Sequence, residues 1–117
     1  MHKMTYTVTK TYTKQDDATF WPWEKDGYGD GLVKSLNDKK LVSVNLSEDG
    51  NTATSTQVWS SKSDYEDVVK SKSDAGLKSL QELWVTYMAL NNISCRVVRD
   101  DGSIRVFNSS SQSFEAE

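Results

Sequence analysis

The stretch MTYTVTKTYT, residues 4–13, alternates strictly between two kinds of side chain. Tyr6, Val8 and Tyr12 fall on one face together with Lys10, and threonines fall on the other. Because successive side chains of a strand point to opposite faces, this period of two predicts a strand. A chain with such a strand is constrained to build a sheet that has one apolar face and one hydroxyl-rich face.

Two Asp-Gly turns predict two antiparallel hairpins. Glycine readily adopts the positive φ angles that tight hairpin turns require. Asp49-Gly50 separates the β-rich segments 41–47 and 52–59, and Asp101-Gly102 separates 93–98 and 103–108. We therefore expect four further strands in these segments.

Helices are expected between the strands, at about 30–38, 64–71 and 74–91. The second is marked by Ser63 and Glu66, which have the spacing of a capping box. The third has apolar residues at helical spacing, among them Trp84 and Tyr87. The polar, low-complexity residues 109–117 predict a disordered tail.

The element order is strand, helix, strand, strand, helix, strand, followed by one extra C-terminal strand. This split β-α-β arrangement predicts a single α+β domain, residues 1–108, with an antiparallel sheet and helices on one face. The apolar residues expected on the helix-covered face are Val42, Val44, Leu46, Cys95, Val97, Ile104 and Val106. The opposite face would carry Thr5, Thr7, Thr9, Thr11, Ser43, Asn45, Ser94 and Arg96, whereas the facing of residues 52–59 stays open.

Composition argues against several partners. The formal net charge of −3 and the scattered basic residues give no reason to expect nucleic acid. No apolar run approaches the length of a membrane span, and residues 1–10 lack a signal-peptide pattern, so we expect no membrane partner and a cytoplasmic location. The single cysteine, Cys95, cannot form an intramolecular disulfide and fits a reducing compartment.

The sequence assigns no catalytic residue, metal site or cofactor. The only histidine, His2, lies near the N-terminus, where an ordered triad, zinc site or haem ligand is not expected. The segment DGYGDG, residues 26–31, lacks key calcium-loop ligands and the Gly-Lys-Ser/Thr of a phosphate loop. Cys95 is expected to be a buried, inert thiol.

Aromatic residues are the remaining candidates for a site. Flat aromatic walls with a polar edge suit small organic ligands. The glycine-rich loop 19–31 carries Trp21, Trp23 and Tyr28, which either plug the open end of the sheet or form a lid on a pocket. The full candidate pocket comprises Trp21, Trp23, Tyr28, Trp59, Tyr65, Trp84 and Tyr87.

The segment STQVWSSKSDYEDVVKSKS, residues 55–73, resembles the third-strand-to-second-helix junction of the dimeric α+β barrel superfamily. That superfamily includes the antibiotic-biosynthesis monooxygenase-like proteins. The resemblance implies a ferredoxin-like βαββαβ protomer whose sheet packs face to face with a second copy, with the Thr-rich face as the homodimer interface. It also implies a small-ligand pocket. Haem-degrading members use a histidine on the second helix, and residues 74–91 contain none.

Three functions remain open at this point. The first is a non-enzymatic homodimer that acts as a binding or interaction module for a small organic ligand. The second is a cofactor-independent monooxygenase or isomerase acting on a small aromatic or lactone substrate through Trp59, Trp84 and Tyr65. The third, supported only by the small polar composition, is an assembly or virion component.

Overall fold

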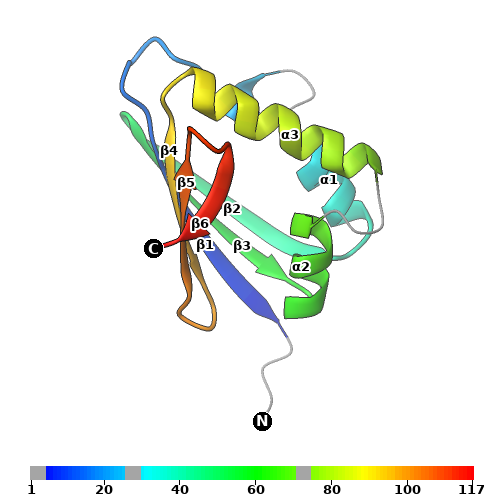
Figure 1. Ribbon diagram of the computed structural model, residues 1–117. Helices are drawn as coiled ribbons and strands as arrows, with labels where there is room; N and C mark the ends of the chain where they lie inside the picture. Colours follow the sequence, from blue (N-terminus) through cyan, green and yellow to red (C-terminus); the bar gives the residue numbers. More distant parts are fainter. Residues whose placement is uncertain (1–4, 26–29, 71–74) are drawn as a thin grey trace.

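One antiparallel sheet organises the part of the chain that the structure describes (Figure 1). The computed structural model describes residues 5–25, 30–70 and 75–117, with the side chains of these ranges except 30–32 and 75–80. Its elements are, in chain order, β1 (Tyr6–Thr13), η1 (Pro22–Glu24), α1 (Asp30–Asn37), β2 (Leu41–Asp49), β3 (Thr52–Trp59), α2 (Lys62–Lys70), α3 (Ala75–Leu90), β4 (Ser94–Arg99), β5 (Ile104–Asn108) and β6 (Ser113–Ala116). The fold class is therefore α+β, as the sequence predicts.

The first strand lies inside the sheet rather than at its edge. The strand order is β2-β3-β1-β4-β5-β6, and β1 pairs antiparallel with both β3 and β4. The part β2-β3-β1-β4 is compatible with a ferredoxin-like fold, to which β5 and β6 are added. Both Asp-Gly turns are present, with Gly50 at φ 60° and Gly102 at φ 85°.

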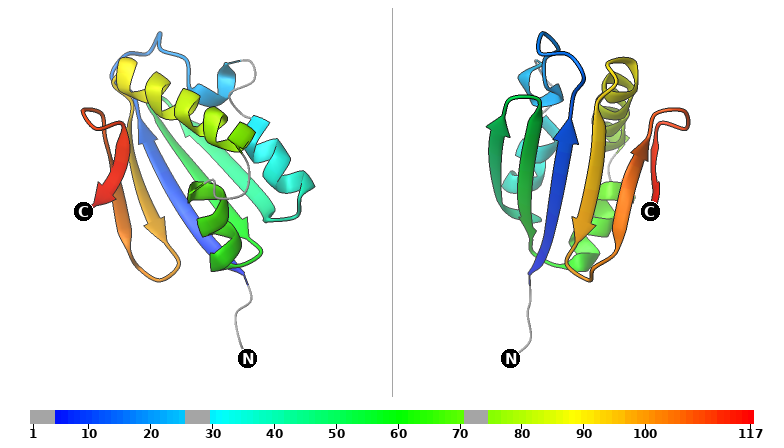
Figure 2. Two further views of the ribbon diagram at one scale, coloured as in Figure 1. Left: turned by 45° about the vertical axis from the view of Figure 1, so that its right-hand side comes forward. Right: turned by 90° about the vertical axis from the view of Figure 1, so that its left-hand side faces the viewer.

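The helices lie on one face of the sheet and leave the other face uncovered within the described residues (Figure 2). On β1, the buried residues Tyr6, Val8 and Tyr12 point toward the helices. The remaining buried hydrophobic residues are Trp21, Leu41, Ala53, Trp59, Tyr65, Val68, Met88, Ile93, Cys95, Val97 and Phe107. The register places the alternating buried residues of β3 on this helix-covered face, which the sequence left open.

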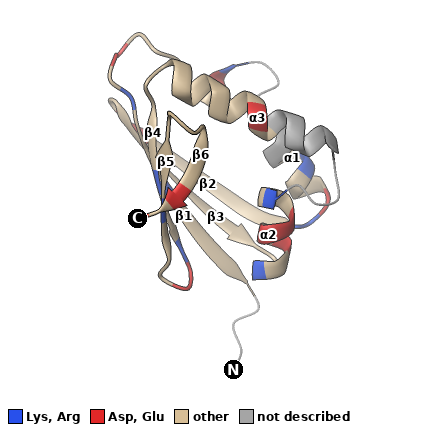
Figure 3. Ribbon diagram, viewed as in Figure 1, with Lys and Arg blue, Asp and Glu red and all other residues tan. Residues whose placement is uncertain are grey.

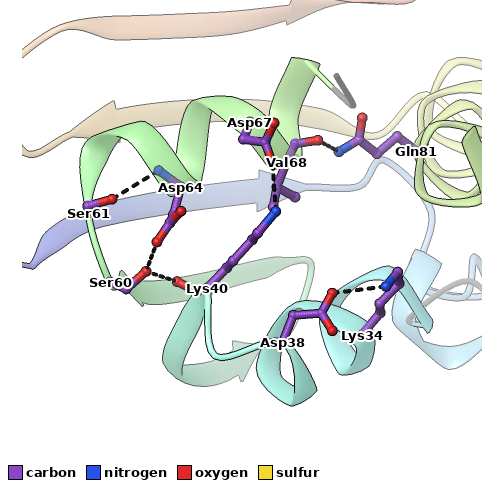
Figure 4. A network of polar contacts seen from close by, with 9 residues as sticks. All are labelled: Lys34, Asp38, Lys40, Ser60, Ser61, Asp64, Asp67, Val68 and Gln81. Atoms are coloured by element: carbon purple, nitrogen blue, oxygen red, sulfur yellow. Dashed lines mark hydrogen bonds and ion pairs between the residues drawn. The ribbon is translucent and has the colours of Figure 1, made fainter. Parts of the chain in front are cut away.

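Polar contacts connect α2 to its neighbours (Figure 4). Lys40, which precedes β2, forms an ion pair with Asp67 of α2 at 2.5 Å. Gln81 of α3 donates a hydrogen bond from Nε2 to the Val68 carbonyl at 2.5 Å. These contacts fix α2 at one end of the sheet. The helix carries both acidic and basic residues (Figure 3), and its Lys62 forms an ion pair with Asp101 in the β4–β5 turn at 3.2 Å.

The cap of α2 differs from the prediction. The Ser61 hydroxyl, not Ser63, accepts the hydrogen bond from the Asp64 backbone N–H at 3.0 Å. Ser60 also donates a hydrogen bond to the Asp64 side chain. The helix begins two residues earlier than expected, because Ser61 and Asp64 have the same spacing of polar residues as Ser63 and Glu66.

The helix layer leaves the edge strand β2 largely uncovered. Val44 and Leu46 lie opposite Gln57 and Ser55, so they are on the predicted face. They are nonetheless 36% and 41% exposed. Val42 lies at a register shift between Leu41 and Ser43 and is 56% exposed, so its assignment to the covered face is wrong.

The facing of β5 is the reverse of the prediction. Arg105 lies opposite Val97, and Val106 lies opposite Arg96. Ile104 and Val106 therefore lie on the uncovered face, whereas Arg105 and Phe107 lie toward the helices. The turn determines this facing, because the Arg99 backbone N–H donates a hydrogen bond to the Ser103 carbonyl and so sets which face each β5 residue takes. Polar and apolar residues are mixed along β5, so its sequence alone does not reveal the facing.

The C-terminal residues form a strand where a disordered tail is predicted. Residues 113–116 form β6, which pairs with β5. Phe114 lies opposite Phe107 with a ring-centroid distance of 5.3 Å. This aromatic contact anchors a segment that is otherwise polar and exposed.

Candidate functional site

A cavity of about 520 Å³ lies between the helix-covered face of the sheet and helices α2 and α3. This volume suits a small organic molecule. Elements β1, β3, α2, α3 and β6 each contribute one aromatic side chain to its wall: Tyr12, Trp59, Tyr65, Trp84 and Phe114. The cavity therefore offers flat, apolar surfaces.

Trp59 and Tyr65 form a fixed corner of this wall. Their ring centroids are 5.4 Å apart, with an interplanar angle of 65°. The Trp59 indole donates a hydrogen bond from Nε1 to Oε1 of buried Gln57 at 3.2 Å, which fixes its orientation. Both aromatic residues are almost fully buried, so the corner is part of the core as well as of the cavity.

Basic side chains outnumber acidic ones in the described lining. The cations are Lys10, Lys70, Arg99 and Arg105, and the carboxylate is Glu66. Glu66 is an ion-pair partner of Lys70 at 4.0 Å, on the exposed surface of α2. Lys10, Arg99 and Arg105 have no ion-pair partner among the described residues.

Arg99 and Arg105 are neighbours on the sheet. Arg105 lies opposite Val97, and Arg99 is two residues further along β4 on the same face. The Nε atom of Arg99 is buried without a hydrogen-bond partner among the described residues. Burial raises the pKa of the Tyr65 hydroxyl, whereas the nearby guanidinium groups of Arg99 and Arg105 act in the opposite direction. The two arginines thus gather beside Tyr65.

Lys10 occupies the middle of the central strand. It lies opposite Ser55 on one side and Val97 on the other, both of which are buried. Burial lowers the pKa of the Lys10 amine. The nearby Cys95 thiol is buried too, and burial raises its pKa to about 11. Cys95 is therefore not an activated nucleophile.

The structure divides the predicted pocket residues into two groups. Trp59, Tyr65 and Trp84 line the cavity, whereas Trp21, Trp23 and Tyr87 do not. Trp21 is 3% exposed and belongs to the core, and Trp23 packs against Tyr12 and Trp84. Tyr87 donates its hydroxyl to the Phe20 carbonyl at 2.6 Å. Tyr28 lies outside the described residues.

Sequence reasoning missed the cations of the site. A signal for Lys10 was available, because it interrupts the apolar face of residues 4–13. No comparable signal marks Arg99 and Arg105, since the facing of β5 depends on the turn that precedes it.

In the described part of the chain, no group of three or more His, Cys, Asp or Glu residues is placed to hold a metal ion. No helix in the described ranges is long and apolar enough to cross a membrane. In comparisons with protein-family models, curated proteins and solved structures, nothing matched the chain.

Proposed function

We propose that this chain is a binding module for a small organic anion with a flat ring. The observation that carries the proposal is the set of three cations, Lys10, Arg99 and Arg105, that line an aromatic cavity without ion-pair partners among the described residues. All three residues are partly buried. A cation that is partly removed from water without a counter-charge is unfavourable, and an anionic ligand would offset that cost.

The cavity can bind both the anionic group and the ring of such a ligand. A guanidinium group forms paired, charge-assisted hydrogen bonds with a carboxylate or phosphate group. Trp59, Trp84 and Tyr65 provide flat surfaces on which a ring can stack. The catalytic alternative would use these same three aromatic residues, but the unpaired cations favour binding and identify no reaction.

The test compares ligands of the same shape and different charge. Benzoate, phenyl phosphate and neutral benzamide are titrated while tryptophan fluorescence and heat release are measured. We expect the anions to bind and benzamide to bind at least about tenfold more weakly, since one charge-assisted hydrogen bond contributes roughly 1.5–3 kcal/mol. Equal binding of benzamide and benzoate would exclude an anion site.

The third arginine supplies a matched control. Arg96 lies on β4 like Arg99, but on the uncovered face, where it pairs with Glu117 at 2.9 Å. Arg99→Gln and Arg105→Gln should each weaken benzoate binding by about tenfold or more, whereas Arg96→Gln should leave it unchanged. An equal loss in all three variants would indicate a general electrostatic effect rather than a site.

The same proposal includes a ferredoxin-like protomer that forms a homodimer through its Thr-rich face. Its support is the strand order and the absence of a covering layer on that face within the described residues. Light scattering should then give twice the mass of the chain. Thr9→Arg, between Thr56 and Val98 on this face, should give the monomer mass, and Ser109→Arg in the exposed β5–β6 turn should not. A monomer mass for the unaltered chain at high concentration would rule out the dimer.

A further inference from the structure

Lys10 stands in one row with Arg105 across three strands. Lys10 of β1 lies opposite Val97 of β4, and Val97 lies opposite Arg105 of β5. All three side chains are on the helix-covered face and line the cavity. Because neighbouring strands are separated by about 4.8 Å, the two cationic residues are anchored roughly 10 Å apart. A ring with a carboxylate at one end and a second group at the other can bridge such a separation.

The amine of Lys10 is held differently from the surface lysines. The amines of Lys34, Lys40 and Lys62 form ion pairs with aspartates. The Nζ atom of Lys10 has no hydrogen-bond or ion-pair partner among the described residues, and the buried residues Tyr12, Ser55 and Val97 are its neighbours on the sheet. Burial lowers its pKa, which increases the fraction of neutral amine. A neutral lysine amine in a cavity is a nucleophile toward carbonyl groups.

We propose that Lys10 forms an imine with an aromatic aldehyde whose carboxylate is held by Arg99 and Arg105. The inference rests on the proposed function, because it takes the same cavity as the binding site for an aromatic anion. It adds a covalent step and assigns the reacting atom, Nζ of Lys10.

The step requires only the amine and the aldehyde. The lone pair of the neutral amine attacks the carbonyl carbon, the N–C bond forms, and the carbonyl π electrons move to oxygen. The resulting carbinolamine loses water, which takes its oxygen from the aldehyde and its two hydrogens from the amine nitrogen. The product is a C=N bond between Lys10 and the ligand, and water reverses the reaction.

The probe for this step is 4-formylbenzoate in the presence of sodium cyanoborohydride, which reduces the imine to a stable secondary amine. Labelled sites are identified by peptide mass spectrometry after reaction at about pH 7.5. We expect Lys10 to be labelled about tenfold faster than Lys62, because a larger fraction of its amine is neutral. Benzoate should slow the labelling of Lys10 and not that of Lys62.

Two variants test whether the amine of Lys10 is the labelled group. Lys10→Arg replaces the amine with a guanidinium group, which does not form the imine, so this variant should lose the dominant label. Lys62→Arg is the matched control on the surface of α2 and should keep the Lys10 label. Circular dichroism checks that each variant is folded. If Lys10→Arg does not fold, the comparison of labelling at Lys10 and Lys62 in the unaltered protein still tests the imine.

The outcomes distinguish this inference from the proposed function. If benzoate binds and Lys10 is labelled no faster than Lys62, the imine is excluded and the anion site stands. If Lys10 is labelled rapidly without protection by benzoate, the reactive amine stands and the anion site fails. If neither binding nor selective labelling occurs, both are wrong.

Discussion

The indole rings of Trp21 and Trp23 stack with centroids 5.0 Å apart and planes 12° from parallel. The pair lies in the connection between β1 and α1, and Pro22 between them is the first residue of η1. Trp23 in turn contacts Tyr12 and Trp84, two residues of the cavity wall. The tryptophans of this loop therefore support the site from behind rather than lining it.

Trp21→Ala should lower the free energy of unfolding by about 3–5 kcal/mol, because it removes a large buried side chain. Urea denaturation measures this loss. In the folded fraction, benzoate affinity should change little, since Trp21 does not line the cavity. A large loss of affinity with unchanged stability would instead make Trp21 part of a lid.

Lys10→Met should raise the free energy of unfolding by about 1 kcal/mol or more while weakening benzoate binding. The substitution replaces a partly buried amine, which has no partner among the described residues, with an apolar side chain of similar length. Burial lowers the pKa of Lys10 in the folded protein, so the charged amine destabilises the fold at neutral pH. This destabilisation disappears as the pH rises toward 10.5, the pKa of a free lysine. The advantage of the variant should shrink over the same range, as measured by urea denaturation at increasing pH.

Cys95→Ala should reduce the loss of stability at alkaline pH. The thiol ionises near 9.0 in the unfolded chain and near 11 in the folded protein, where burial raises its pKa. The folded state therefore retains the proton between these values, and the stability contribution of Cys95 is complete below pH 9 and is lost as the pH rises to about 11. Between these limits, the stability difference between the unaltered protein and the variant should change by about 2 kcal/mol. A constant difference would contradict the assignment.

Phe114→Ala should lower both the melting temperature and the affinity for benzoate. Phe114 contacts Phe107 across β5 and β6 and also lines the cavity. Its removal costs about 1–3 kcal/mol for a partly buried aromatic residue, which shifts the melting temperature by several degrees. Calorimetry and titration measure the two effects. Ser113→Ala, an exposed neighbour, is the control and should change neither.

Local sequence patterns predicted the elements well because each depends on neighbouring residues. The alternation of residues 4–13 gave β1, and Gly50 and Gly102 marked turns that require positive φ angles. Helix spacing placed Trp84 toward the sheet, and three of the predicted pocket residues line the cavity.

The remaining features depend on contacts between distant residues. The exposure of Val44 and Leu46 follows from the edge position of β2, which no local pattern reveals. The strand at residues 113–116 depends on the contact between Phe114 and Phe107. Lys10, Arg99 and Arg105 come from β1, β4 and β5, so their convergence on one cavity requires the register of the sheet.

The central position of β1 also has a consequence for how the chain folds. The hairpin β2–β3 and the meander β4–β5–β6 join strands that are adjacent in sequence, so each can form early from local contacts. β1 must then pair with residues that are far away in the sequence, since Thr13 pairs with Thr52 and Val8 pairs with Arg99. We therefore expect the two halves to form first from local contacts and the insertion of β1 between them to be the slow step of folding.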